Sequence, residues 1–191
     1  MNVTVLGAGA WGTALAMSLA RRHRVTLWTH TPAHVAEMAA SRCNRRYLPG
    51  FDFPPALRLE SDLAAAAGGA GLLLVVVPTA GLRQTLQALA EAGAAASLVW
   101  ACKGFEPGTA KLPHQVVAEV LGDRPASGVL SGPSFAQEVA RGLPTALTLA
   151  SESESFARDT AHQLHDTRLR VYSCTDVVGV EIGGALKNVM A

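Results

Sequence analysis

Three glycines near the start of the chain have the spacing of a phosphate-binding turn. The segment Gly7-Ala8-Gly9-Ala10-Trp11-Gly12 follows the apolar run Val3–Leu6 and precedes the Ala- and Leu-rich stretch Thr13–Arg21, which we expect to be a helix. The first glycine permits a tight turn, the second lets a pyrophosphate approach the backbone, and the third allows close helix–strand contact. A simple turn is the alternative, but a strand before the motif and a helix after it favour a dinucleotide site.

Two lysines stand where an ammonium group has chemical uses. Lys103 comes directly after an apolar strand and before Gly104, so we expect it to face a bound nicotinamide or a substrate phosphate. Lys187 follows Gly183 and Gly184 on an apolar helical pattern. Glycines cost about 1 kcal/mol each inside a helix, so the close approach of a backbone or ligand would explain them. Lys187 is therefore a candidate acid/base group, and a solvated surface lysine is the alternative at both positions.

A second turn of glycine and hydroxyl residues, Ser131-Gly132-Pro133-Ser134, lies between a strand and a helix that begins near Ala136. Such a turn suits the polar end of a substrate, although a helix cap with proline in the first turn would have the same sequence. His162 and His165 are spaced like ligands but lack a third partner. This turn is therefore a candidate contact for the polar end of a substrate, and we predict no metal site.

The predicted second strand ends at Trp28-Thr29-His30, where a chain specific for NAD would carry an acidic residue. No acid stands there, so nothing repels a 2′-phosphate, and either NADPH or NADH is allowed. His30 is a candidate contact to the adenosine end, with an exposed loop residue as the alternative. Arg45 and Arg46 are a weaker candidate pair.

The alternation of strand and helix patterns predicts a doubly wound, Rossmann-type α/β fold with a mostly parallel sheet. Two loops, Ser41–Pro55 and Lys103–Pro113, are expected at the carboxyl ends of strands, facing the ligand crevice. We assign residues 1–175 to this domain and 176–191 to the first helix of a truncated helical substrate domain. The predicted strands are Val3–Leu6, Arg24–Trp28, Leu57–Leu59, Leu72–Val77, Leu98–Ala101, Gly128–Leu130, Ala146–Leu149 and Leu169–Tyr172.

The composition is that of a globular protein with little net charge. The 191 residues carry 16 basic and 15 acidic side chains, a formal charge of +1, so we expect no nucleic-acid partner. The longest apolar run is shorter than the ~20 residues of a membrane-spanning helix, so no membrane insertion is expected. Three widely spaced cysteines suggest free thiols in a reducing cytoplasm.

Taken together, the motifs resemble a known family. Bacterial NAD(P)-dependent glycerol-3-phosphate dehydrogenase is similar to this chain in the glycine turn and in four further segments, which are Val75–Pro78, Lys103-Gly104, Ser131–Ala136 and Gly183–Val189. Cys43-Asn44 and Tyr47-Leu48-Pro49 also match the family's loop. The resemblance implies interconversion of dihydroxyacetone phosphate and sn-glycerol 3-phosphate, feeding glycerophospholipid synthesis, by a protein that is a homodimer when full length.

The resemblance also implies roles for particular residues. The cofactor, NADPH or NADH, would contact Gly7, Gly9, Gly12, Ala10, Trp11, His30, Lys103 and Ala136. The phosphorylated substrate would meet Lys103, Gly132 and Ser134, and Lys187 would be the proton donor and acceptor, with Lys103 as the second catalytic lysine.

Two departures qualify the resemblance. Thr31 and Pro32 follow His30 where the family often has an arginine, which weakens the case for a strong NADP preference. The family's helical domain, which supplies an Arg-Asn pair to the substrate, is missing, so we expect this fragment to bind cofactor without full activity. The alternatives are a β-hydroxyacid dehydrogenase of the 6-phosphogluconate type and a non-enzymatic nucleotide sensor.

Overall fold

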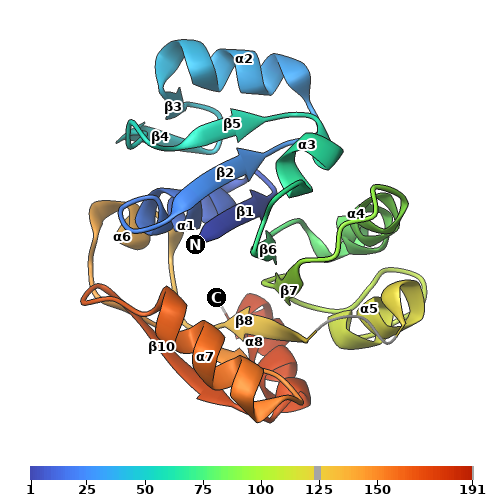
Figure 1. Ribbon diagram of the computed structural model, residues 1–191. Helices are drawn as coiled ribbons and strands as arrows, with labels where there is room; N and C mark the ends of the chain where they lie inside the picture. The colour runs from blue at the N-terminus through green and yellow to red at the C-terminus, as the bar shows by residue number, and fades with distance from the viewer. Residues whose placement is uncertain (123–125, 191) are drawn as a thin grey trace.

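The computed structural model describes residues 1–122 and 126–190, with side chains described through residue 186. Its centre is an eight-stranded sheet of order β10-β9-β8-β7-β6-β1-β2-β5 (Figure 1). All neighbouring strands are parallel except β8 and β9, so the mostly parallel Rossmann-type fold is confirmed. The strands are β1 (Asn2–Leu6), β2 (Arg24–Trp28), β5 (Arg58–Glu60), β6 (Leu72–Val75), β7 (Ser97–Trp100), β8 (Ser127–Ser131), β9 (Thr145–Ala150) and β10 (Leu169–Cys174).

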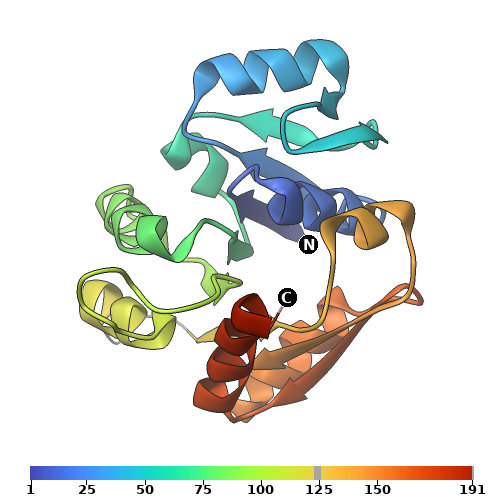
Figure 2. The same ribbon diagram turned by 180° about the vertical axis from the view of Figure 1, so that it is seen from behind.

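The central strands are buried on both faces, as their continuous apolar sequences predict. All four residues of β6 are buried, and so are the last four of β1. Helices therefore cover both sides of the sheet. Figures 1 and 2 show α7 and α8 on opposite faces of β9 and β10, with α4 and α5 next to each other. The helices are α1 (Ala10–Leu19), α2 (Pro32–Ser41), α3 (Leu63–Ala67), α4 (Thr79–Glu91), α5 (Pro113–Leu121), α6 (Ala136–Arg141), α7 (Glu154–Leu164) and α8 (Val177–Met190).

The first helix begins earlier than the sequence pattern suggested. Gly9 is the N-cap of α1, and the Thr13 amide donates to the Gly9 carbonyl at 2.9 Å. The expected start at Thr13 was therefore wrong, because Ala10, Trp11 and Gly12 already form the first helical turn. The turn thus presents the amino end of α1 directly after β1.

The segment Ser41–Pro55 is a hairpin rather than an irregular loop. It forms the antiparallel strands β3 (Cys43–Asn44) and β4 (Leu48–Asp52). Its prolines argued against strands, but Pro49 is tolerated because β4 pairs on one side only, with β3. Asn44 connects this hairpin to the glycine turn, because its side-chain amide donates a hydrogen bond to the Ala8 carbonyl.

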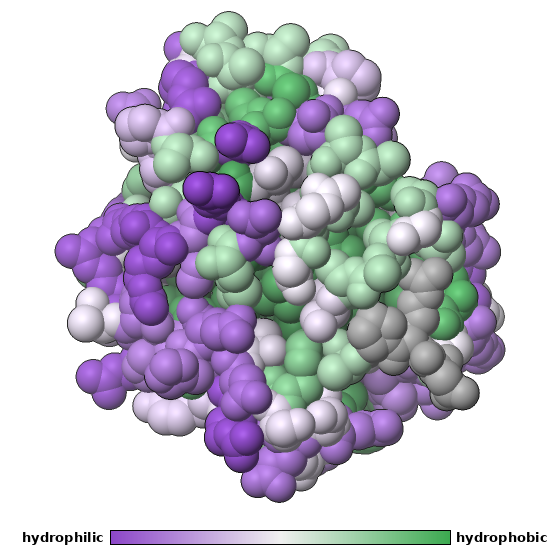
Figure 3. All heavy atoms as spheres, in the orientation of Figure 1, coloured by the Kyte–Doolittle hydropathy of each residue, from purple (hydrophilic) through white to green (hydrophobic). Residues whose placement is uncertain are grey.

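The surface combines polar and apolar areas. Polar residues gather on the side of α6 and α7 in the view of Figure 3. Within the part of the chain that the structure describes, no helix is long and apolar enough to cross a membrane. The division into domains at residue 175 stays a prediction, although α8 does begin at Val177.

Candidate functional site

The three glycines of the turn serve different purposes. Gly7 has φ +121°, and a Cβ there would lie 2.5 Å from the Val76 carbonyl oxygen. A Cβ on Gly12 would overlap the Gly7 carbonyl oxygen. At Gly9, in contrast, φ is −72° and a Cβ would meet no atom within 4 Å. The chain itself requires glycine at positions 7 and 12, whereas position 9 faces open space.

That space is a pocket of about 510 Å³ at the carboxyl ends of β1, β6 and β7. The amino end of α1 opens into it, so unpaired amides and the positive end of the helix dipole face its interior. Such a position favours the phosphates of a ligand. Lining residues include Gly9, Ala10, Trp11, Gly12, Val76–Ala80, Ala101–Lys103, Phe105, Pro107, Ser134 and Ala136.

Lys103 connects this pocket to the second turn. Its side chain is half-buried, and Nζ donates to the Gly132 carbonyl at 3.2 Å. Its own carbonyl accepts a hydrogen bond from the Thr79 hydroxyl at 2.8 Å. The structure thus brings the glycine turn, Lys103, Gly132 and Ser134 together.

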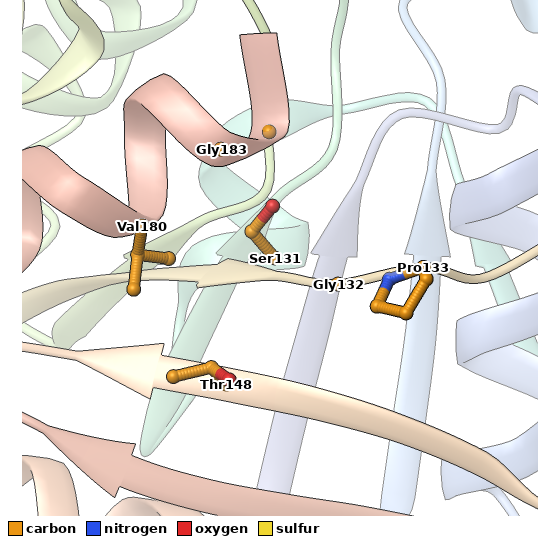
Figure 4. Close-up of a pocket in the computed structure, with 7 residues that line it drawn as sticks. Ser131, Gly132, Pro133, Thr148, Val180 and Gly183 are labelled. Atoms are coloured by element: carbon orange, nitrogen blue, oxygen red, sulfur yellow. The ribbon is translucent and has the colours of Figure 1, made fainter. Parts of the chain in front are cut away.

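A second hollow, of about 290 Å³, lies between the Ser131–Pro133 turn, Thr148 and α8 (Figure 4). Gly184 lies against its wall, because a Cβ there would be 2.6 Å from Ser131 Oγ and 3.7 Å from Lys103 Cγ. Gly183 lines the hollow, and a Cβ there would meet nothing within 4 Å. The close approach predicted for the helix glycines is therefore confirmed at Gly184, whereas at Gly183 the approach of a ligand stays a prediction.

The loop after Lys103 is held by an ion-pair network. Arg83 Nε and Glu106 Oε1 are 2.8 Å apart, and Arg83 also contacts Glu119 at 2.8 Å. The Arg83 guanidinium, followed by the Thr109 hydroxyl, lowers the pKa of Glu106 to about 2. The network fixes the segment that brings Phe105 to the pocket. Sequence analysis missed Phe105, whose one signal was its place two residues after Lys103.

His30 is exposed at the end of β2, with its ring 6.3 Å from that of Trp28. It is not among the residues that line the glycine-turn pocket. Arg45 and Arg46 are exposed as well. Position 187 lies on α8, but the side chain of Lys187 lies outside the described residues. Among the described residues no cluster could hold a metal ion, and Cys43, Cys102 and Cys174 are free.

Comparison with known proteins gives the family. The profile described as NAD-dependent glycerol-3-phosphate dehydrogenase N-terminus matches residues 2–157. The chain belongs to this family. The resemblance found in the sequence is therefore confirmed, and the 6-phosphogluconate-type alternative is not the family matched.

Relatives within the glycerol-3-phosphate dehydrogenase family align with the whole chain. The glycerol-3-phosphate dehydrogenase (NAD(P)+) of Nitrosomonas eutropha is 62% identical over 100% of this chain and 58% of that protein. The enzyme of the same name from Thiobacillus denitrificans is 58% identical with the same coverage. The crystal structure of glycerol-3-phosphate dehydrogenase from Coxiella burnetii has a TM-score of 0.92 and 42% identity, over 99% of this chain and 58% of that one. The chain thus spans 58% of the length of these relatives.

Proposed function

We propose that the protein containing this chain interconverts dihydroxyacetone phosphate and sn-glycerol 3-phosphate by hydride transfer, with NADPH or NADH as cofactor. The observation that carries the proposal is that one and the same pocket is lined by the glycine turn, Lys103 and Ser134, in a chain of this family. The glycines offer a phosphate site, and the lysine and serine offer groups for a small polar substrate next to it.

The cofactor fits the residues present. Gly9 leaves open the space in front of the α1 amides, which a pyrophosphate would occupy. Ala10, Trp11 and Ala136 line the same pocket and provide surface for the rest of the dinucleotide. When bound, the dinucleotide supplies the hydride. Gly7 and Gly12 shape the turn, and His30 is assigned to the adenosine end from its place just after β2 and from the family resemblance.

The substrate would lie beside Lys103 and the Ser131–Ser134 turn. Lys103 Nζ is 3.2 Å from the Gly132 carbonyl oxygen, so the ammonium group and this turn belong to one site. Reduction of a ketone develops negative charge on its oxygen, which a nearby ammonium stabilises and then protonates. By the family resemblance, Lys187 delivers that proton, and Lys103, Gly132 and Ser134 hold the substrate.

The proposal is tested with a chain of the relatives' full length. Oxidation of NADPH or NADH should require dihydroxyacetone phosphate and should be lost when Lys103 is replaced by Met. A matched variant, Lys111→Met, removes a lysine that pairs with Glu119 outside the pocket and should retain turnover. Binding of the reduced cofactor without any substrate-dependent oxidation would contradict the enzyme and support the sensor alternative.

We also propose that the full-length protein is a cytoplasmic homodimer that takes no nucleic acid. The free, buried Cys43 and Cys102 are compatible with a reducing compartment. Light scattering of the full-length protein tests the homodimer, and fractionation of cells tests the cytoplasmic location.

A further inference from the structure

A buried carboxylate, Glu181 on α8, is the centre of a hydrogen-bond cluster outside the pocket. Its side chain is 1% exposed. Oε1 accepts from the Trp100 indole nitrogen at 2.7 Å and from the His114 main-chain amide at 2.9 Å. Oε2 contacts His114 Nδ1 at 2.6 Å. A buried carboxylate is tolerated only with such partners, and hydrogen bonds to an ionised acceptor are among the strong ones.

The donors come from two other elements of the fold. Trp100 is the last residue of β7, and His114 is the second residue of α5. The first amides of a helix have no partner within the helix, so Glu181 satisfies one of them and complements the positive end of α5. One side chain therefore holds α8 to both β7 and α5.

The same contacts tie together the two segments that carry the lysines. Lys103 follows Trp100 by three positions, and Lys187 follows Glu181 by six on α8. Between them stands Gly184, one turn after Glu181, where α8 lies close to Ser131 Oγ and Lys103 Cγ. Residues three apart on a helix are neighbours on its surface, so position 184 lies next to both position 181 and position 187.

We propose that Glu181 is a positioning residue for this reaction. Its bonds to Trp100 and His114 set the register of α8 against the Lys103 segment, and thereby hold position 187 at the substrate pocket. An apolar residue would fill the same buried space but would not specify a register. Specifying the register between packed elements is a role attested for buried polar groups. The inference rests on the proposed function, because it acts through Lys187.

The test uses the full-length protein and three variants. Glu181→Leu removes the acceptor at similar volume, and Glu181→Gln keeps an amide oxygen for Trp100 and the His114 amide. Leu164→Ala on α7, buried at 2% exposure, is the stability control. All are assayed well below their melting temperatures for kcat, KM and NADH affinity.

Glu181→Leu should lower kcat by about 100-fold, because small misplacements of reacting groups have effects of that size. NADH affinity should stay unchanged, since the cofactor pocket does not include Glu181. Glu181→Gln should restore kcat to within about tenfold of the wild type. Leu164→Ala should lower the melting temperature and keep kcat. If the role of Glu181 were merely structural, Glu181→Leu would give this same result. Unchanged kcat in a folded Glu181→Leu protein, or loss of kcat and NADH affinity together, would overturn the proposal.

If Glu181→Leu does not fold, Trp100→Phe decides the question. It removes one donor and leaves both contacts with His114, and kcat should fall about tenfold at constant NADH affinity. An unchanged kcat would overturn the proposal. Lys187→Met measured in parallel separates the two proposals, because a Lys187→Met variant that turns over contradicts the lysine's role itself. Loss of turnover in Lys187→Met but not in the Glu181 and Trp100 variants contradicts only the positioning role.

Discussion

The side-chain amide of Asn44 donates a hydrogen bond to the main-chain oxygen of Ala8, with 2.9 Å between Nδ2 and O. The same nitrogen donates to Thr13 Oγ1 at 2.8 Å. Oδ1 accepts from the Tyr47 amide at 3.2 Å and lies 3.1 Å from His34 Nε2. Asn44 is fully buried, so the hairpin holds the glycine turn through one satisfied side chain.

Replacing Asn44 by Leu should weaken both the fold and the turn. Each partner left buried and unpaired costs about 1–3 kcal/mol, and the Ala8 carbonyl lies within the phosphate-binding turn. We expect a lower unfolding free energy in urea and weaker binding of NADH by the chain. Ser151→Ala, which removes the hydrogen bond from the buried Ser151 to the Ser127 carbonyl far from the turn, should lower stability alone. Equal NADH affinity in the Asn44 variant and the wild type would show that the turn does not depend on this bond.

Gly9→Val should abolish nucleotide binding and leave the fold intact, because its side chain enters open space in front of α1. Titration with NADH and thermal unfolding measure the two effects. Gly12→Ala is the opposite control, since its Cβ overlaps the Gly7 carbonyl and should destabilise the chain by about 1–3 kcal/mol. Wild-type nucleotide affinity in Gly9→Val would place the pyrophosphate elsewhere.

Discrimination between NADPH and NADH should be modest. No acid stands at the end of β2, and Arg45 and Arg46 are exposed rather than fixed near His30. Titrations of the chain with both dinucleotides measure the ratio. A preference above ~1000-fold, which is about 4 kcal/mol, would require a recognition element that these residues do not provide.

In the full-length enzyme, Lys187→Met should remove most turnover and leave nucleotide binding nearly intact. The thioether has similar length but neither donates a proton nor stabilises a developing alkoxide. Positioned acid–base catalysis is typically worth about 10²–10⁴-fold, so kcat should fall by that factor. Loss of substrate binding alone would instead raise KM at constant kcat. A variant that keeps more than about a tenth of kcat would exclude Lys187 from the acid/base role.

The network around Glu106 predicts a pH dependence of stability. The folded-state pKa is about 2, against an ordinary value of 4.5, mainly because Arg83 binds the ionised form. The stabilisation is therefore fully present above about pH 4.5 and is lost as pH falls towards about 2. Urea unfolding across this range should show a weaker pH dependence in Glu106→Gln than in the wild type. Identical pH profiles would contradict the assignment.

Local patterns predicted the elements that local sequence determines. The glycine turn, the buried strands and the loop after Lys103 all follow from spacing over a few residues, and the structure places them as expected. The hairpin at residues 43–52 was missed because proline usually argues against a strand, whereas here β4 pairs on one side only and tolerates Pro49. The contacts of Asn44 and Glu181 were missed for another reason. Their partners lie 36 and 81 positions away, and no periodicity in one sequence records such contacts.

The reversed strand β9 determines which end of the last helix reaches the pocket. Because β9 and β10 run against β8, α8 starts at the far edge of the sheet, where Val177 lines a cleft with Ser127 at the beginning of β8. The helix then runs in the same direction as β8, and Gly184 reaches Ser131 at that strand's end. The later turns of α8, and not its first turn, therefore lie in the region of the two lysines. With β9 parallel to β8, the first turn of α8, whose amides have no partner within the helix, would have lain there instead.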